Sequence, residues 1–166
     1  MSTPVINEPR PALYRGLTER LVSEQLVSSA GAAEIAEQAR TQSKTLIQEL
    51  LDGNHIDSAA LAAIVSEEYG VPLFNLTPMV REHFPLDLVP QSLIRKHKAL
   101  PLYRRGNRLF IAIADPTNTS ALAEFKFATG IATDSVVVEQ KQLLETISEV
   151  IAKQDEVFDG DIADFA

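Results

Sequence analysis

Apolar residues recur at helical spacing through residues 14–70, as in amphipathic helices that cover a core. Ser28 and Asp57 each precede such a stretch, and their side-chain oxygens suit them to cap the free N–H groups of a helix start. Gly70 closes the last stretch, as expected of a helix C-cap. The pattern therefore predicts four helices, whose apolar stripes include Leu17 and Leu21, Ile35 and Ala39, Leu46 and Leu50, and Leu61 and Val65.

The two halves of this helical region form an internal repeat with an offset of 29 residues. Two helix pairs of the same design would bury their apolar stripes against each other, because neither pair buries its face alone. The alternative is a chance similarity, since amphipathic helices resemble one another by period alone. The coinciding positions are Leu21 and Leu50, Val22 and Leu51, Val27 and Ile56, Ser28 and Asp57, Ile35 and Ile64, and Ala36 and Val65.

A different pattern follows in the C-terminal half and is centred on residues 99–118. Two short apolar runs, 99–103 and 109–114, flank Gly106-Asn107. This pair suits a tight turn because both residues adopt positive φ at low cost. Asp115-Pro116 ends the second run, since proline cannot donate to a strand ladder. The stretch therefore predicts a β-hairpin.

The remaining elements surround this hairpin. Helices are predicted at 90–97, 120–128 and 140–153, and a β-branched run predicts a third strand at 134–138. The predicted fold class is α+β, a helical repeat bundle followed by a small three-stranded α/β sandwich. The predicted organisation is a flexible arm at 1–13, the helical repeat at 14–72, a proline-rich connector at 73–88, the α/β subdomain at 89–153 and an acidic linker at 154–166.

Composition excludes several classes of function. The formal net charge of −8 over 166 residues would repel a phosphate backbone, so no nucleic-acid partner is expected. The absence of cysteine excludes thiolate catalysis and Cys-ligated zinc. His55, His83 and His97 lack metal-ligand spacing, so no metal site is predicted. No apolar run reaches the length of a membrane span, so no membrane insertion is expected.

One basic concentration stands out in this acidic chain. Arg104, Arg105 and Arg108 surround the hairpin turn, and residues 95–98 precede the hairpin. These side chains form either a solvated face or a docking surface for an acidic partner. No Gly-x-x-x-x-Gly-Lys sequence is present, so the chain lacks a P-loop and no catalytic residue is predicted.

Two groups of motifs carry a family resemblance. Leu100-Pro101-Leu102, Arg105-Gly106-Asn107-Arg108 and Asp115-Pro116 follow one another in the hairpin, and Tyr69-Gly70-Val71-Pro72 closes the helical repeat. Over about residues 14–153 the chain resembles the N-terminal region of PilB-type type IV pilus assembly ATPases, in the secretion ATPase family that includes GspE and MshE. The resemblance implies no cofactor here, an ATP- and Mg²⁺-dependent hexameric motor beyond Ala166, and a cytoplasmic location held near the inner membrane by partners.

In this family the helical repeat binds cyclic di-GMP through halves that each open with Arg-Leu-Gly. Arginine pairs with a phosphate or guanine edge, and glycine permits close approach of the backbone. The resemblance leaves Arg15 and Arg20 as displaced candidates for nucleotide contacts. The departures are Gly16-Leu17-Thr18 and Thr45-Leu46-Ile47 at the two openings, Gln25 and Asn54 in place of a later Gly, and Ala39 and Glu68 in place of the closing Gln.

The resemblance and these departures together predict a non-catalytic regulatory and docking domain of a pilus extension motor. Its expected partners are a PilZ-type adaptor or inner-membrane pilus platform proteins, and a cyclic di-GMP sensor is the alternative. The leucines of the repeat, its predicted adaptor surface, form either its core, as is usual in amphipathic helices, or an exposed groove. The predicted partner-binding residues are Leu17, Leu21, Leu50, Leu51, Arg104, Arg105 and Arg108.

Overall fold

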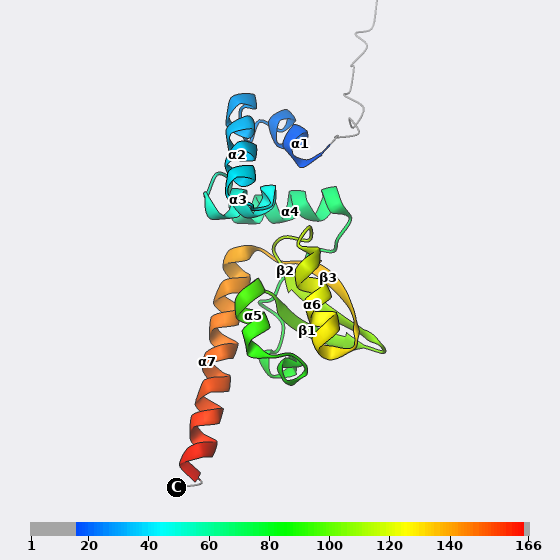
Figure 1. Cartoon of the computed structure of the whole chain (residues 1–166), viewed down its shortest axis with the longest axis vertical. Coiled ribbons are helices and arrows are strands. Elements are labelled where there is room, and N and C mark those ends of the chain that lie inside the picture. The colour runs from blue at the N-terminus through cyan, green and yellow to red at the C-terminus, as the bar shows by residue number, and fades with distance from the viewer. Residues whose placement is uncertain (1–15, 165–166) are drawn as a thin grey trace, which may run out of the picture.

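A helical domain stands on one end of a small α/β domain, and a long C-terminal helix runs down the side of the latter (Figure 1). The computed structural model describes residues 16–164, with side chains to residue 157, so the predicted arm at 1–13 and Arg15 lie outside the described residues. No helix in this range has the length and apolar content needed to cross a membrane. The helical domain consists of α1 (Leu17–Ser23), α2 (Ser29–Thr41), α3 (Leu46–Asp52) and α4 (Ser58–Tyr69).

The internal repeat is structural and not a chance similarity. Helices α1 and α3 begin 29 residues apart, and so do α2 and α4. Ser28 Oγ accepts a hydrogen bond from Gly31 N at 3.0 Å, and Asp57 Oδ2 accepts one from Ala60 N at 3.2 Å. The predicted caps are thereby confirmed. The repeat is not complete, because Ala36 is exposed while its counterpart is buried.

The α/β domain confirms the predicted hairpin and its third strand. Strands β1 and β2 pair antiparallel, and β2 pairs with β3 in parallel, in the order β1-β2-β3. Gly106 has φ 60° at the turn, a conformation that glycine adopts without steric cost. The elements are α5 (Gln91–His97), β1 (Leu100–Arg105), β2 (Arg108–Ile113), α6 (Thr119–Thr129), β3 (Ala132–Val137) and α7 (Gln140–Asp164).

The connector belongs to the α/β domain. Phe74 N donates to Val137 O at 2.8 Å, and Val137 N donates to Pro72 O at 2.8 Å, so the connector pairs with the free edge of β3. Leu76 and Phe84 are buried in the α/β core, so the connector is docked on that core. Two 3₁₀ turns shape the segment, η1 (Arg81–His83) and η2 (Leu86–Leu88).

Helix α7 is longer than predicted. The apolar stripe places its end near Lys153, but the helix continues to Asp164 and projects past the domain (Figure 1). The predicted helix end is wrong because acidic composition alone does not end a helix, and no proline follows Lys153 to interrupt it. Residues 154–164, which the acidic composition predicted as part of a linker, are helical.

The two domains have separate apolar cores that meet at β3. Val137 is fully buried and packs against the core of the helical domain, whereas its neighbours Val136 and Val138 belong to the core of the α/β domain. Because alternate residues of a strand face opposite sides, the end of β3 supplies both cores. The domain junction is therefore formed by packed side chains.

Candidate functional site

The opening of the second repeat half is tied to the end of β2. Thr45 Oγ1 accepts a hydrogen bond from Gln48 N at 3.0 Å and donates one to Asp115 Oδ2 at 2.5 Å. Asp115 Oδ1 accepts a hydrogen bond from Thr117 N at 2.9 Å, and the Asp115 residue is only 7% exposed. A buried carboxylate therefore lies beside Thr45, the residue that the resemblance aligns with the first residue of the Arg-Leu-Gly motif.

Arg20 is fully engaged with protein groups of the helical domain. Its Nε lies 2.9 Å from Glu24 Oε1, and its Nη2 forms an ion pair with Glu67 on α4. Its Nη1 lies 3.4 Å from Ile64 O and 3.8 Å from Glu68 Oε2. Glu67 and Glu24 raise the pKa of Arg20 above its ordinary value, with Glu67 as the main cause. Arg20 therefore links α1 to α4, and its guanidinium binds the carboxylates of the protein itself.

The structure corrects one of the two predicted roles for the repeat leucines. Leu17, Leu21 and Leu50 are buried in the helical core, and Leu51 is half-buried against it. They form the core and not an exposed groove, because the two helix pairs pack their stripes against each other. Three of the four predicted partner-binding leucines therefore have no surface to offer a partner.

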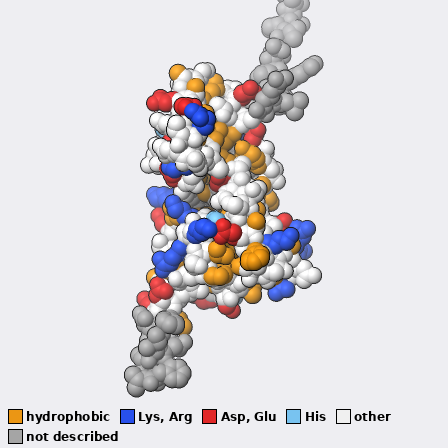
Figure 2. Space-filling model, viewed as in Figure 1, with side chains coloured by type: hydrophobic (Ala, Val, Ile, Leu, Met, Phe, Trp, Pro, Cys, Tyr) orange, Lys and Arg blue, Asp and Glu red, His pale blue; other side chains and the backbone are white. Residues whose placement is uncertain are grey.

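The predicted basic concentration is divided between two ends of the sheet. Residues 95–98 precede β1, whereas the hairpin arginines lie at its far end, about 20 Å away for a six-residue strand. Lys96 Nζ lies 3.0 Å from Glu124 Oε1, and Arg95 Nη2 lies 3.6 Å from Asp155 Oδ2. Arg95 and Lys96 are thus paired within the domain, and the hairpin arginines form a separate basic surface at the other end of the sheet (Figure 2).

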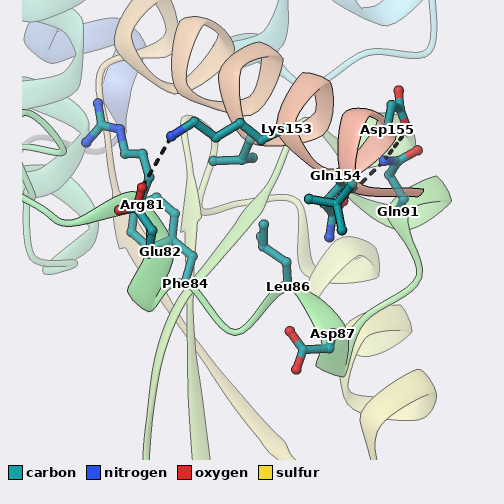
Figure 3. A pocket seen from close by; sticks show the side chains of 11 residues that line it. Arg81, Glu82, Phe84, Leu86, Asp87, Gln91, Lys153, Gln154 and Asp155 are labelled. Atoms are coloured by element: carbon teal, nitrogen blue, oxygen red, sulfur yellow. Dashed lines mark hydrogen bonds and ion pairs between the residues drawn. The ribbon is translucent and has the colours of Figure 1, made fainter. Parts of the chain in front are cut away.

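A pocket that the sequence analysis missed lies between α7, α5 and the connector (Figure 3). Its volume is about 730 Å³, and its apolar wall includes Phe84, Leu86 and Val150. Lys153 Nζ bridges the rim to Glu82 Oε1 at 3.2 Å. The signal in the sequence was the pair of apolar residues in the connector, but nothing in it indicated that they would face α7 and leave a hollow.

The described part of the chain contains no group of side chains that could bind a metal ion. Within residues 16–157, no group of three or more His, Asp or Glu side chains is placed to hold a metal ion. His97 Nε2 lies 3.1 Å from Glu124 Oε2, whereas His55 lies in the loop between α3 and α4 and His83 lies in η1. The described residues therefore provide no set of side chains that could coordinate a metal ion.

A comparison with models of known protein families identifies the family of this chain. The model of the MshEN domain matches residues 69–157, more than half of the chain. The chain belongs to the MshEN domain family. The match begins at Tyr69, the last residue of α4, so it covers the α/β domain with its connector and leaves the helical repeat outside. The resemblance to the N-terminal region of the PilB, GspE and MshE ATPases is confirmed.

Relatives of known name agree with this assignment. The type IV pilus assembly ATPase PilB of Pseudomonas aeruginosa is 34% identical over 128 residues, which cover 77% of this chain and 23% of that protein. PilB of Myxococcus xanthus is 30% identical over 151 residues, which cover 89% of this chain and 27% of that protein. The chain therefore spans about a quarter of the length of these curated relatives.

Solved structures share the fold of this MshEN chain. A structure of MshE with cyclic di-GMP has a TM-score of 0.63 and 22% identity, and the match covers 82% of this chain and 99% of that one. A structure of the N-terminal domain of XpsE has a TM-score of 0.57 and 20% identity, with coverage of 85% and 97%. At these identities the likeness establishes a common fold.

Proposed function

We propose that this chain is the N-terminal regulatory and docking domain of a type IV pilus extension motor. Its PilB relatives are named as pilus assembly ATPases, and one solved relative is an N-terminal domain. The ATP- and Mg²⁺-dependent activity would belong to another part of a hexameric protein, since this sequence has no P-loop. The proposal includes a cytoplasmic location next to the inner membrane.

The domain would act by changing orientation when a partner binds. A PilZ-type adaptor or a pilus platform protein would bind one orientation of the domain more tightly and so shift the population toward it. Helix α7 is the route of transmission, because it packs on the α/β core and continues as a helix beyond it. The half-buried Leu51 and the hairpin residues Arg104, Arg105 and Arg108 are the proposed partner contacts.

The contact between Thr45 and Asp115 carries this proposal. It supports protein docking because the helical frame of the repeat is kept while the position of the second motif arginine is filled by a structural hydrogen bond. A phosphate brought to this point would meet the buried Asp115 carboxylate without a compensating cation, which costs free energy.

Cyclic di-GMP sensing is the second candidate, and the MshE structure favours it. That protein holds cyclic di-GMP on the same fold, which is more direct support than the comparisons give to any protein partner. This chain also keeps a left-handed backbone at Gln25 and Asn54, with φ of 60° and 49°, where the family motif has glycine. The backbone of the repeat is therefore compatible with the nucleotide, and the side chains of this chain disfavour it.

Calorimetric titration of this 166-residue chain distinguishes the two candidates. Protein docking predicts no heat with cyclic di-GMP and a one-to-one isotherm with the PilZ-type adaptor or the platform protein of the same cell. Micromolar heat with the nucleotide would overturn docking as the main function. In that case Arg20→Gln should abolish the heat, while Arg40→Gln serves as the control, because Arg40 is an exposed arginine on α2 that pairs only with Glu37.

A further inference from the structure

One end of the sheet gathers cations around an exposed aromatic side chain. Because β2 and β3 are parallel and Arg108 is paired with Ala132, the end of α6 lies at the same end of the sheet as the hairpin turn. We call the surface formed by the hairpin turn and the end of α6 the tip face (Figures 1 and 2). Its exposed residues are Arg104, Arg105, Arg108, Lys126 and Phe127.

The tip face carries charge and apolar area that the domain itself does not use. Arg108 Nη1 pairs with Asp134 Oδ2 at 2.6 Å, and Arg104 Nε donates to Gly106 O of its own turn at 3.0 Å. The Arg105 side chain has no hydrogen bond or ion pair to any described residue. Phe127 is 93% exposed, the highest value among the large hydrophobic residues described. Removing such a ring from water is favourable, so the face gains most from a partner that is both acidic and apolar.

The chain itself contains a segment of that chemistry. After Lys153 the sequence has five carboxylates and no Lys or Arg, and the described residue Val157 is 65% exposed. The segment also contains Phe158 and Ile162, four positions apart. It is helical to Asp164 and continuous with the packed part of α7. Its first residues still contact α5, through Asp155 and Arg95 at 3.6 Å, and the helix then projects past its own domain on the side away from the tip face (Figure 1).

We propose that the tip face binds the acidic end of α7, residues 154–164, of a second copy of this chain. The inference rests on the proposed docking function but changes one part of it: the hairpin arginines are assigned to a second copy of this chain in place of the adaptor or platform protein. The contact is heterologous, because each copy uses its tip face for one neighbour and its α7 end for another. Such a contact closes into a ring or continues as a filament. Each exposed ion pair adds little, so the contact is weak between free domains and strengthens where copies are held together.

Sedimentation velocity of the chain at increasing concentration tests this inference. We expect association that weakens at least about tenfold when salt is raised enough to shorten the Debye length to about 3 Å. Arg105→Glu and Glu156→Lys should each weaken association about fivefold or more, because each places like charges together. An equimolar mixture of the two variants should associate again, since the swapped tip face matches the swapped helix end. Phe127→Ala should also weaken association, and as an exposed position it should leave folding intact.

Matched controls separate this contact from a general charge effect. Arg40→Glu makes the same change on α2 at an exposed arginine and should leave association unchanged. A chain that stays monomeric at all concentrations, or association that Arg105→Glu does not affect, overturns the inference. If the adaptor binds the wild-type chain but not Arg105→Glu, the adaptor occupies the tip face and the inference is wrong. Adaptor binding without self-association leaves the docking function standing on its own.

Discussion

Thr45 Oγ1 donates a 2.5 Å hydrogen bond to Asp115 Oδ2, although the two residues are 70 positions apart in the chain. The bond joins the first residue before α3 to the residue that ends the hairpin. A second bond between the domains runs from Ser58 Oγ to Glu139 Oε1 at 2.7 Å. Both hydrogen bonds thus attach the second repeat half to the α/β domain. Their donors, Thr45 and Ser58, lie at the starts of α3 and α4.

Thr45→Val should lower the free energy of unfolding by about 2–4 kcal/mol. The substitution removes a helix cap, worth about 1 kcal/mol, and a hydrogen bond to a buried carboxylate, worth about 1.5–3 kcal/mol. Urea unfolding measures the change, with Thr45→Ser as the control because serine keeps the hydroxyl. A double-mutant cycle with Asp115→Ala should give a coupling of at least about 1 kcal/mol. Additive effects of the two substitutions would show that the bond does not hold the junction.

Gln25→Gly should stabilise the chain more than Asn54→Gly. Both residues have a left-handed backbone, with φ of 60° and 49°, which costs about 1–2 kcal/mol for most side chains and less for asparagine. Glycine removes this cost but adds freedom to the unfolded chain, so we expect a net gain of about 0.5–1 kcal/mol at Gln25 and close to none at Asn54. Thermal and urea unfolding give the order, and destabilisation by Gln25→Gly would contradict the conformational argument.

The parts of the fold with local chemical signals could be predicted from the sequence. Ser28 and Asp57 are caps because each offers an oxygen to free N–H groups, and Gly106 marks the turn because it accepts positive φ. These signals lie within a few residues of the feature that they produce. The helix order and the hairpin followed from them, and the third strand followed from its β-branched residues.

The parts that depend on contacts between distant residues could not be predicted. Nothing near Pro72 indicates that its carbonyl accepts a hydrogen bond from Val137 N, and the pocket beside Phe84 follows from the same docking of the connector. Helix α7 passed its predicted end because solvent-exposed polar residues give no periodic signal. The candidate site shows the same limit, since the sequence placed Thr45 at a motif position but could not place Asp115 beside it.

Leu50→Ala should destabilise the helical domain far more than Leu51→Ala. Leu50 is 1% exposed within the helical core, whereas its neighbour is half-buried. Truncation of a buried leucine costs about 2–5 kcal/mol because it removes apolar contacts and leaves a cavity. Hydrogen exchange of the backbone amides should locate the loss in α1–α4 and leave protection of β1 and β2 largely unchanged. Equal effects of the two substitutions would show that the leucines are not divided between core and rim as the structure has them.

Glu124→Gln should destabilise the chain at neutral pH, and the destabilisation relative to wild type should shrink in acid. Glu124 lies against His97 and Lys96, which lower the pKa of its carboxyl below the ordinary value, with His97 as the main cause. A group whose pKa is lowered by folding stabilises the folded state fully above its unfolded pKa, and loses that contribution as the pH falls through its folded pKa. The difference in unfolding free energy between wild type and Glu124→Gln should therefore be constant near neutral pH and shrink below about pH 4.

Urea unfolding at a series of pH values measures this difference. Glu145→Gln is the matched control, because this substitution removes the same charge. Glu145 is exposed on α7 and has no ion pair to any described residue. A difference for Glu124→Gln that stays constant from neutral pH into acid would mean that the contacts with Lys96 and His97 do not persist in solution. The tie between α5 and α6 would then rest on apolar packing around Phe125, which is fully buried, and the charge pattern at the start of β1 would be a solvated surface.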